Sequence, residues 1–293
     1  MGILDRFRSL FASQSVDVYD RFEILRKAVS GTMSKFYMAR ERKTGKIVGL
    51  KIADLDKVAL FESRFKELKK PSEGEIAIGL SHPLVVKTYE HGVSKKGEPY
   101  LVMEFIQGPG LHQLLHNRDP IIEGHRLRLI RQMAEALQYV HEQEYIHRDI
   151  CPRNFIYETE SGDVKLIDFG LTLPARREFM QPGNRTGTPL YMAPEVVRRR
   201  WTDHRLDIFA MGVSAYQICT YEFPWPGTET TGRAALAHDT HDPKDILQWR
   251  PNLNRILAKA IMQCIEANPN NRPQSVAEFL KRIRPVDVDD RPE

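Results

Sequence analysis

Residues 145–156 read Tyr-Ile-His-Arg-Asp-Ile-Cys-Pro-Arg-Asn-Phe-Ile, and residues 164–170 read Val-Lys-Leu-Ile-Asp-Phe-Gly. Asn154 follows Asp149 by five residues, and Asp168 follows Asn154 by fourteen. Two carboxylates and an amide, on loops beside short apolar runs, supply oxygen ligands for a divalent cation and a partner for a hydroxyl nucleophile. These groups suit the transfer of a phosphoryl group, which is catalysed largely by positioning and charge neutralisation.

Both segments, in this order and spacing, resemble the catalytic core of a eukaryotic-type protein kinase, and the resemblance extends from about residue 20 to residue 284. It implies a two-lobed α+β fold. The N-terminal lobe would be small and rich in antiparallel strands with one key helix, and the C-terminal lobe larger and mainly helical. We expect an N-terminal extension over residues 1–18, the lobes over residues 19–105 and 106–285, and a disordered tail over residues 286–293.

The composition limits the class of protein. The chain has 293 residues, of which 41% are hydrophobic, enough for a sizeable core. A net charge of +4 does not indicate a nucleic-acid partner. The cysteines are widely spaced and form no metal-binding pair, which suits a reducing cytoplasm: Cys151, Cys219 and Cys264. No apolar run approaches the roughly 20 residues of a membrane-spanning helix.

Residues 1–18 contain apolar side chains at helical spacing, namely Leu4, Phe7 and Phe11. One interpretation is a helix that docks on a membrane surface or a partner through residues 3–11. The favoured alternative is an extension that frays or packs on the neighbouring lobe. Arg6 stands where the N-myristoylation pattern requires Ser or Thr, so acylation is not supported.

The resemblance assigns an ion pair to the N-terminal lobe. Residues 48–51, Val-Gly-Leu-Lys, take the place of the family's Val-Ala-Ile-Lys, so Lys51 is expected to hold the α- and β-phosphates of ATP. Glu73 is its expected partner, with Glu75 as the alternative. Gly74 and Gly79 weaken the predicted helix by about 1 kcal/mol each relative to alanine. A mobile helix would make the ion pair open to regulation.

The same lobe is expected to bind the adenine and phosphates. Of the three positions of the family's glycine-rich loop only Gly31 remains a glycine, since Val29 and Ser34 occupy the others, so the loop should be stiffer. Phe36 replaces a valine over the adenine, and Gly49 replaces an alanine. Either the bulk that one adds is partly offset by the other, or the pocket is narrowed.

The strand before the lobe boundary resembles the family's hinge. The resemblance makes Met103 the gatekeeper beside the adenine and assigns the backbones of Glu104 and Ile106 to the adenine edge. Ordinary burial in a strand explains the apolar residues equally well, so this assignment depends on register alone.

The resemblance also assigns roles around the quoted stretch. Asp149 is expected to accept the proton of the acceptor hydroxyl or to orient it, and Asn154 and Asp168 are expected to bind Mg²⁺. Cys151 stands where serine/threonine kinases carry a lysine for the γ-phosphate. Arg153 stands where tyrosine kinases carry an arginine, and we expect it to supply the missing charge.

Residues 187–191, Gly-Thr-Pro-Leu-Tyr, resemble the platform that seats the acceptor in serine/threonine kinases, where Thr188 is expected to bond the catalytic aspartate. Arg148 is typical of kinases whose activation loop is ordered by phosphorylation through an arginine–phosphate pair. Between this platform and the Asp-Phe-Gly motif the hydroxyl residues are Thr172 and Thr186, and Thr186 is the predicted phosphosite.

Other features have structural interpretations. Glu195 is expected to pair with Arg272, and Asp207 is expected to tie a central helix to the catalytic loop. The arginines at 176–177 and 198–200 favour either acidic substrates or, more simply, a solvated face. The histidines at 238 and 241 suggest a metal site only weakly, since the family has a variable loop there.

The favoured hypothesis is a cytoplasmic serine/threonine kinase that uses ATP and Mg²⁺ and acts on protein substrates. The alternative is a pseudokinase that serves as a nucleotide-binding or scaffold module. The altered glycine-rich loop, Phe36 and Cys151 support it, as do the small residues Ala77 and Thr88 at apolar positions. A tyrosine or dual-specificity kinase and a small-molecule phosphotransferase are less favoured.

Overall fold

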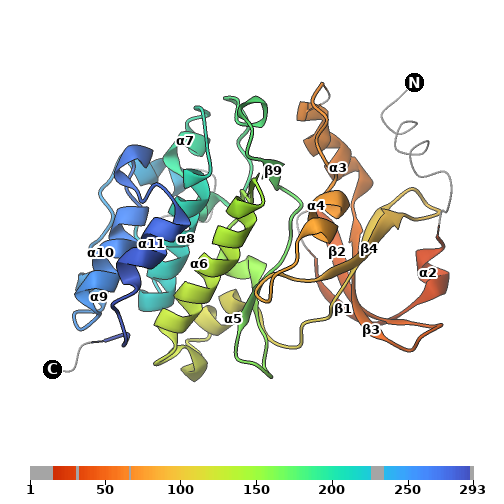
Figure 1. The fold of residues 1–293 in the computed structure, drawn as a ribbon, viewed down its shortest axis with the longest axis horizontal. Coiled ribbons are helices and arrows are strands. Elements are labelled where there is room, and N and C mark those ends of the chain that lie inside the picture. Colours follow the sequence, from red (N-terminus) through yellow and green to blue (C-terminus); the bar gives the residue numbers. More distant parts are fainter. Residues whose placement is uncertain (1–15, 31–32, 66, 226–233, 291–293) are drawn as a thin grey trace. The chain divides into compact units, whose positions relative to one another are not determined.

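The computed structural model describes residues 16–30, 33–65, 67–225 and 234–290 (Figure 1). Gly31 and the predicted docking segment, residues 3–11, lie outside these ranges. The chain divides into two compact units, Met1–His82 with Val86–Ile106 and Pro83–Val85 with Gln107–Glu293.

An antiparallel sheet with the strand order β1-β2-β3-β5-β4 forms the first unit. Its strands are β1 (Phe22–Ser30), β2 (Ser34–Glu41), β3 (Ile47–Ala53), β4 (Thr88–Val93) and β5 (Pro99–Met103). The central strand β3 is buried along almost its whole length, as its continuous apolar run predicts. One core cluster joins α2 (Val18–Arg21) to β1, β2, β3 and β5 through Val18, Phe22, Ala39, Val48, Leu50, Ile52, Tyr100 and Val102.

The start of the described chain belongs to this unit. Val16 forms a parallel bridge with Ser94, and Val18 is buried in the core cluster. The end of the predicted extension, residues 16–18, therefore packs on the sheet.

The described part of the first unit also contains α3 (Leu55–Glu62) and α4 (Glu73–Gly79), with the 3₁₀ turn η1 (Ser63–Phe65) after α3. Helix α4 begins at Glu73 because Ser72 caps it: the Ser72 hydroxyl accepts from the Glu75 N–H at 3.2 Å, and the Ser72 N–H donates to the Glu75 carboxylate at 2.7 Å. This capping box satisfies two backbone donors at the helix start.

Four helices make up most of the second unit, α6 (Arg126–Glu142), α8 (Arg205–Thr220), α10 (Arg255–Cys264) and α11 (Val276–Ile283). Figure 1 shows α6 beside α8, with α10 and α11 packed on them. Helix α6 buries the apolar stripe predicted for it: Leu127, Ile130, Met133, Ala134, Leu137 and Val140. In the described ranges, no helix combines the length and the apolar character needed to cross a bilayer.

Short elements complete the second unit: α5 (Leu111–His116), α7 (Pro194–Val197), α9 (Ile246–Trp249), β6 (Tyr145–Ile146), β7 (Phe155–Tyr157), β8 (Val164–Leu166), β9 (Leu173–Pro174), and the 3₁₀ turns η2 (Pro120–Ile122), η3 (Pro152–Asn154), η4 (Arg177–Phe179), η5 (Pro189–Tyr191), η6 (Ala234–Asp239) and η7 (Pro269–Asn271). Strand β6 pairs with β9, and β7 pairs with β8. The loop from β6 to β7 and the loop from β8 to β9 are therefore held next to each other at both ends.

The predicted pair between Glu195 and Arg272 is present. The guanidinium donates to both carboxylate oxygens at 2.7 and 2.9 Å, and both side chains are buried. Removing one partner of such a pair leaves a buried charge, which costs about 3–5 kcal/mol. The pair joins α7, at the end of residues 168–195 (the predicted activation segment), to the chain before α11.

Residues 286–290 are not the disordered tail that their polar composition predicts. The Asp289 carboxylate accepts from the backbone N–H groups of Arg126 and Leu127 at 3.0 and 2.9 Å. It thereby caps the start of α6, because the side chain of the cap residue His125 accepts no hydrogen bond from the first turn of the helix. Asp290 also pairs with Arg250. The segment is ordered because its acids meet partners far away in the sequence.

Candidate active site

In the first unit, Lys51 of β3 forms an ion pair with Glu73, the first residue of α4. Lys51 is only 6% exposed, so this pair is screened little by solvent. The alternative partner, Glu75, is held in the capping box with Ser72. At the helix start, Glu75 therefore caps the backbone, whereas Glu73, the residue selected by its spacing, pairs with Lys51.

The two glycines of α4 differ in what surrounds them. An ideal Cβ on Gly74 would lie 2.5 Å from Cγ of His91 on β4, whereas nothing lies within 4 Å of a Cβ on Gly79. Gly74 is buried, and its lack of a side chain lets α4 approach the sheet at the point where Glu73 reaches Lys51. The residue expected to loosen the helix thus also permits its close packing.

Four of the positions predicted to meet the adenine, Phe36, Gly49, Met103 and Glu104, lie together around the central strand β3. Gly49 is opposite Met103 in the β3–β5 register, and a Cβ on Gly49 would contact Phe36, Met103 and the carbonyl oxygen of Glu104. The Glu104 N–H donates to the Lys87 carbonyl at 2.9 Å, and the Glu104 carbonyl is directed towards position 49. Ile106 is buried at the end of this unit.

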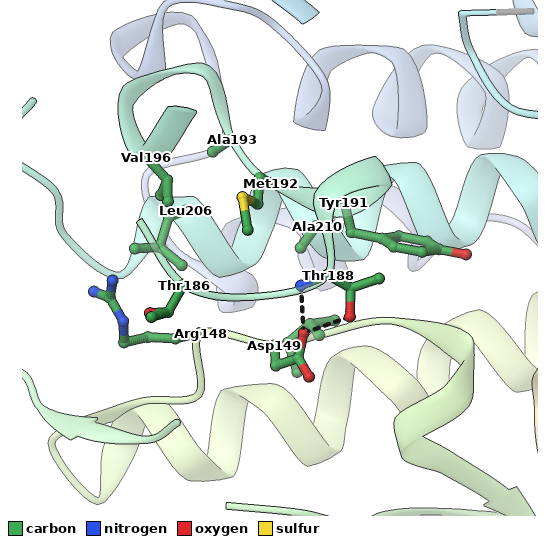
Figure 2. A pocket seen from close by; sticks show the side chains of 11 residues that line it. Arg148, Asp149, Thr186, Thr188, Tyr191, Met192, Ala193, Val196, Leu206 and Ala210 are labelled. Carbon is green, nitrogen blue, oxygen red and sulfur yellow. Dashed lines mark hydrogen bonds between the residues drawn. The ribbon is translucent and has the colours of Figure 1, made fainter. Parts of the chain in front are cut away.

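In the second unit, Asp149 lies on the loop from β6 to β7, and both of its carboxylate oxygens accept hydrogen bonds, one set from Thr188 and one bond from Asn154 of the same loop. Thr188 donates to Oδ1 from its N–H and from its hydroxyl, each at 2.8 Å (Figure 2). Asn154 donates from Nδ2 to Oδ2 of Asp149 at 3.0 Å and to its carbonyl oxygen at 2.7 Å. The aspartate therefore has one well-defined orientation.

The loop from β8 to β9 brings Asp168 next to this arrangement. The Ile167 N–H donates to the Asn154 carbonyl at 2.8 Å, so the residue before Asp168 is bonded to Asn154. Asp168 takes a left-handed φ of 66°, and its Oδ1 accepts from the Gly170 N–H at 3.1 Å. Because Nδ2 of Asn154 faces Asp149, its amide oxygen points elsewhere. Asn154 directly precedes β7 and Asp168 follows β8, its partner strand, and an amide oxygen and a carboxylate placed there fit the hard oxygen ligands that Mg²⁺ prefers.

Asp207 of α8 holds the backbone of the loop from β6 to β7, the predicted catalytic loop, through hydrogen bonds. Its carboxylate accepts from the N–H groups of His147 and Arg148, each at 2.8 Å, and lies 2.9 Å from Nε2 of His141. Burial alone would raise its pKa, but these hydrogen bonds and the neighbouring histidines hold the pKa of Asp207 below its ordinary value. The predicted tie between α8 and the catalytic loop is confirmed.

Cys151 and Arg153 differ in exposure. Cys151 is buried with Sγ 3.8 Å from Oγ1 of Thr188, and burial raises the pKa of its thiol to about 12, so it stays neutral. Arg153, in η3, is exposed. Arg153 also acts on α5, because burial and, after it, the charge of Arg153 lower the pKa of His112 on that helix.

The activation segment approaches the catalytic loop through Gly187. Its φ of 123° favours glycine, and a Cβ there would lie 2.8 Å from the carbonyl oxygen of Arg148. Thr186 and Arg148 line the same small pocket, together with Asp149 and Thr188 (Figure 2). Arg148 donates to the Asn184 carbonyl at 3.2 Å, while the Thr186 hydroxyl donates to the Asn184 side chain at 3.3 Å. Thr172 is fully buried, so it is no target for modification.

The remaining charged motifs lie on the surface of the second unit. Residues 176–177 and 198–200 are exposed, and Arg177 lies 5.2 Å over the ring of Trp201. His238 is buried, where it bonds the Met192 carbonyl at 2.7 Å and stacks on Trp225. Among the residues that the structure describes, no three His, Cys, Asp or Glu side chains form a group able to hold a metal ion. The hydrogen bond to Met192 packs His238 against the segment that follows Thr188.

Comparison with known proteins identifies the family. A model of the protein kinase domain matches residues 22–283. Serine/threonine-protein kinase pkn3 of Myxococcus xanthus is 30% identical over 274 residues, which cover 89% of this chain and 49% of that protein. PknB of Mycolicibacterium smegmatis is 29% identical over 288 residues, 93% of this chain and 44% of that protein. This chain thus spans about half the length of these curated relatives, and it belongs to the protein kinase domain family.

Proposed function

We propose that this chain is an active protein kinase that transfers the γ-phosphate of ATP to serine or threonine hydroxyls of protein substrates. The observation that carries the proposal is the Asp149 carboxylate, held by Thr188 on one oxygen and by Asn154 on the other. A carboxylate fixed in this way is suited to orient a hydroxyl and take up its proton. The relatives named as serine/threonine kinases and the threonine-containing platform both support that acceptor class.

The roles follow from the two sets of residues. In the first unit, Lys51, kept in place by Glu73, would hold the α- and β-phosphates. The adenine would meet Phe36, Gly49, Met103 and the backbones of Glu104 and Ile106, while Gly31 would approach the phosphates. In the second unit, Asn154 and Asp168 would hold Mg²⁺, which neutralises phosphate charge when bound. Arg153 would supply the cation that Cys151 lacks.

Thr186 is the proposed regulatory phosphosite. It lines the same pocket as Arg148, and a phosphate there would form charge-assisted hydrogen bonds with a guanidinium. The Thr186→Ala variant should then be less active than wild-type protein that is isolated with Thr186 phosphorylated. Mass spectrometry of fully active protein with Thr186 unmodified would contradict this role.

The chain offers some support for a cytoplasmic enzyme. Its three cysteines are free and buried, and burial raises the pKa of each thiol. Free thiols persist most readily in a reducing compartment.

A pseudokinase is the second candidate, because Phe36 closes on Gly49 and Cys151 is neutral. Transfer of radiolabelled phosphate from ATP to a generic protein substrate separates the two. Asp149→Asn should abolish incorporation, whereas Asp242→Asn, at an exposed acid of the second unit, should leave it unchanged. Phosphoamino-acid analysis should give phosphoserine or phosphothreonine. Incorporation that survives Asp149→Asn would refute the kinase proposal.

A further inference from the structure

Two basic stretches meet on the surface of the second unit, one before the predicted acceptor platform in the chain and one after it. The guanidinium of Arg177 lies 5.2 Å over the ring of Trp201, and the Thr202 N–H donates to the Met180 carbonyl at 3.3 Å. These contacts hold the two stretches together, although the platform separates them in the sequence. We call the exposed side chains gathered there the arginine patch: Arg176, Arg177, Arg199, Arg200 and Trp201.

The charges of the arginine patch are not paired within the described chain. Among the residues that the structure describes, no acid forms an ion pair with any of its four arginines. Other exposed arginines of this unit do have such partners. Arg118 lies 3.2 Å from Glu222, and Arg128 lies 2.7 Å from Asp163. Glu178 is the one acid within the two stretches. The patch therefore presents guanidinium donors to the solvent and leaves them available to an external anion.

Trp201 orders one of these guanidiniums. Its side chain is 48% exposed, so Arg177 stacks on the ring at the surface and not inside the unit. A guanidinium held on an aromatic ring has already lost part of its rotamer freedom, which lowers the entropy cost of binding a ligand. Its planar N–H fork stays available to a carboxylate.

Met180 connects the patch to the predicted catalytic loop. It is buried, its Sδ lies 3.9 Å from Nη1 of Arg148, and the Thr202 hydroxyl donates to the same sulfur at 3.6 Å. On the other side of the platform, the Arg200 N–H donates to the Glu195 carbonyl at 2.8 Å. Both stretches are thus attached to the segment that is predicted to seat the acceptor.

We propose that the arginine patch docks an acidic segment of the protein substrate, with Arg177 held ready by Trp201, so that acceptors flanked by Asp and Glu are preferred. The inference deepens the proposed function and depends on it for the acceptor. Carboxylates match the guanidinium fork in charge and in shape. A membrane surface fits less well, because interfacial binding needs a broader apolar face than the single ring in this patch.

Docking can be measured without phosphoryl transfer. Fluorescence anisotropy would use a labelled peptide of alternating Asp and Glu, which has no hydroxyl side chain. We expect Arg177→Gln/Arg200→Gln, with one change in each stretch, to raise its Kd about tenfold. The control Arg255→Gln/Arg284→Gln removes the same charge from two exposed arginines outside the patch and should change the Kd by less than about twofold.

Trp201→Leu separates a built site from a diffuse positive field, because it removes no charge. It should raise the Kd about threefold through the loss of order at Arg177. Arg177→Lys keeps the charge, loses the planar fork and should weaken binding similarly. Thermal melting would verify that each variant is folded. Unchanged affinity in both variants would overturn the role of the stacked pair.

Two acceptor peptides that differ only in their flanking residues, acidic in one and glutamine in the other, connect docking to turnover. In wild type we expect the acidic peptide to have a KM about tenfold lower and a similar kcat, because docking stabilises the bound substrate and the transition state alike. In Arg177→Gln/Arg200→Gln the two KM values should become equal.

Each contrary result has a distinct meaning. Equal acidic-peptide affinity of the patch variant and the control variant would overturn the proposal. Patch-dependent binding to vesicles of phosphatidylserine and phosphatidylcholine, without binding of the acidic peptide, would assign this surface to a membrane and overturn it as well. Transfer to both acceptor peptides with equal KM would refute the docking role alone. Patch-dependent binding of the acidic peptide, without transfer to either acceptor, would refute the proposed function and the substrate role of the patch with it.

Discussion

Thr188 donates two hydrogen bonds to the same oxygen of Asp149, one from its backbone N–H and one from its hydroxyl. The other oxygen accepts from Asn154, so the carboxylate cannot rotate without breaking a bond. Gly187 permits this contact, because its left-handed φ and missing Cβ bring the activation segment against the Arg148 carbonyl. The Thr188 side chain thus joins the predicted acceptor platform to the catalytic loop, and substitutions of Thr188 can test the contact.

Replacing Thr188 by valine should lower kcat by about 10- to 100-fold, because valine keeps the shape and removes the hydroxyl donor to Asp149. Thr188→Ser restores the donor and should recover most of the activity. Steady-state kinetics with a protein substrate would measure both variants. A Thr188→Val enzyme with wild-type kcat would show that the backbone N–H alone orients the aspartate.

The two glycines of α4 should respond oppositely to alanine. Gly74→Ala places a methyl group against His91, so α4 must move and the Lys51–Glu73 pair should weaken. We expect kcat/KM to fall at least tenfold and the melting temperature to drop. Gly79→Ala meets no atom and should stabilise the helix by up to about 1 kcal/mol. Equal behaviour of the two variants would contradict close packing at Gly74.

Local pattern and spacing were enough to predict much of this fold. The apolar run of β3 predicts a buried strand, and the three-four periodicity of residues 127–140 predicts the buried face of α6. Spacing selects Glu73, but the capping box that occupies Glu75 is also visible in the sequence as Ser72 followed by a glutamate three residues later. That signal distinguishes the two glutamates without a structure.

Other features depend on distant partners and escape a local argument. Residues 286–290 are polar and read as a tail, yet Asp289 meets backbone donors more than 160 residues earlier. The departures from the family at Phe36 and Gly49 are visible in the sequence. Whether the bulk of Phe36 is offset by Gly49 or narrows the pocket, however, depends on the distance between the two residues. In both cases the missing information is tertiary geometry.

Asp289→Ala should reduce the free energy of unfolding by about 1–2 kcal/mol, because the first N–H groups of α6 lose their acceptor. Asp287→Ala is the matched control, since Asp287 is exposed in the same segment. Denaturant titration would compare the two. Similar stability of the two variants would mean that the segment does not cap α6 in solution.

The stability that Asp207 provides should depend on pH in one direction. Its carboxylate is bonded by the N–H groups of His147 and Arg148, so its folded-state pKa lies below its unfolded-state pKa, which is near 3.9. A carboxyl group of this kind contributes its full stabilisation above the unfolded-state value and loses it as the pH falls through the folded-state value. Asp207→Asn carries no such titration.

The difference in unfolding free energy between wild type and Asp207→Asn should therefore be constant above about pH 5 and shrink as the pH is lowered towards 3. Denaturant titrations at pH 5, 4 and 3 would measure it, with Asp242→Asn, an exposed acid, as the variant whose difference stays small throughout. If the wild-type advantage instead grew as the pH fell, the protonated form of Asp207 would be the one that the fold prefers. The hydrogen bonds from the catalytic loop would then not be those of a carboxylate.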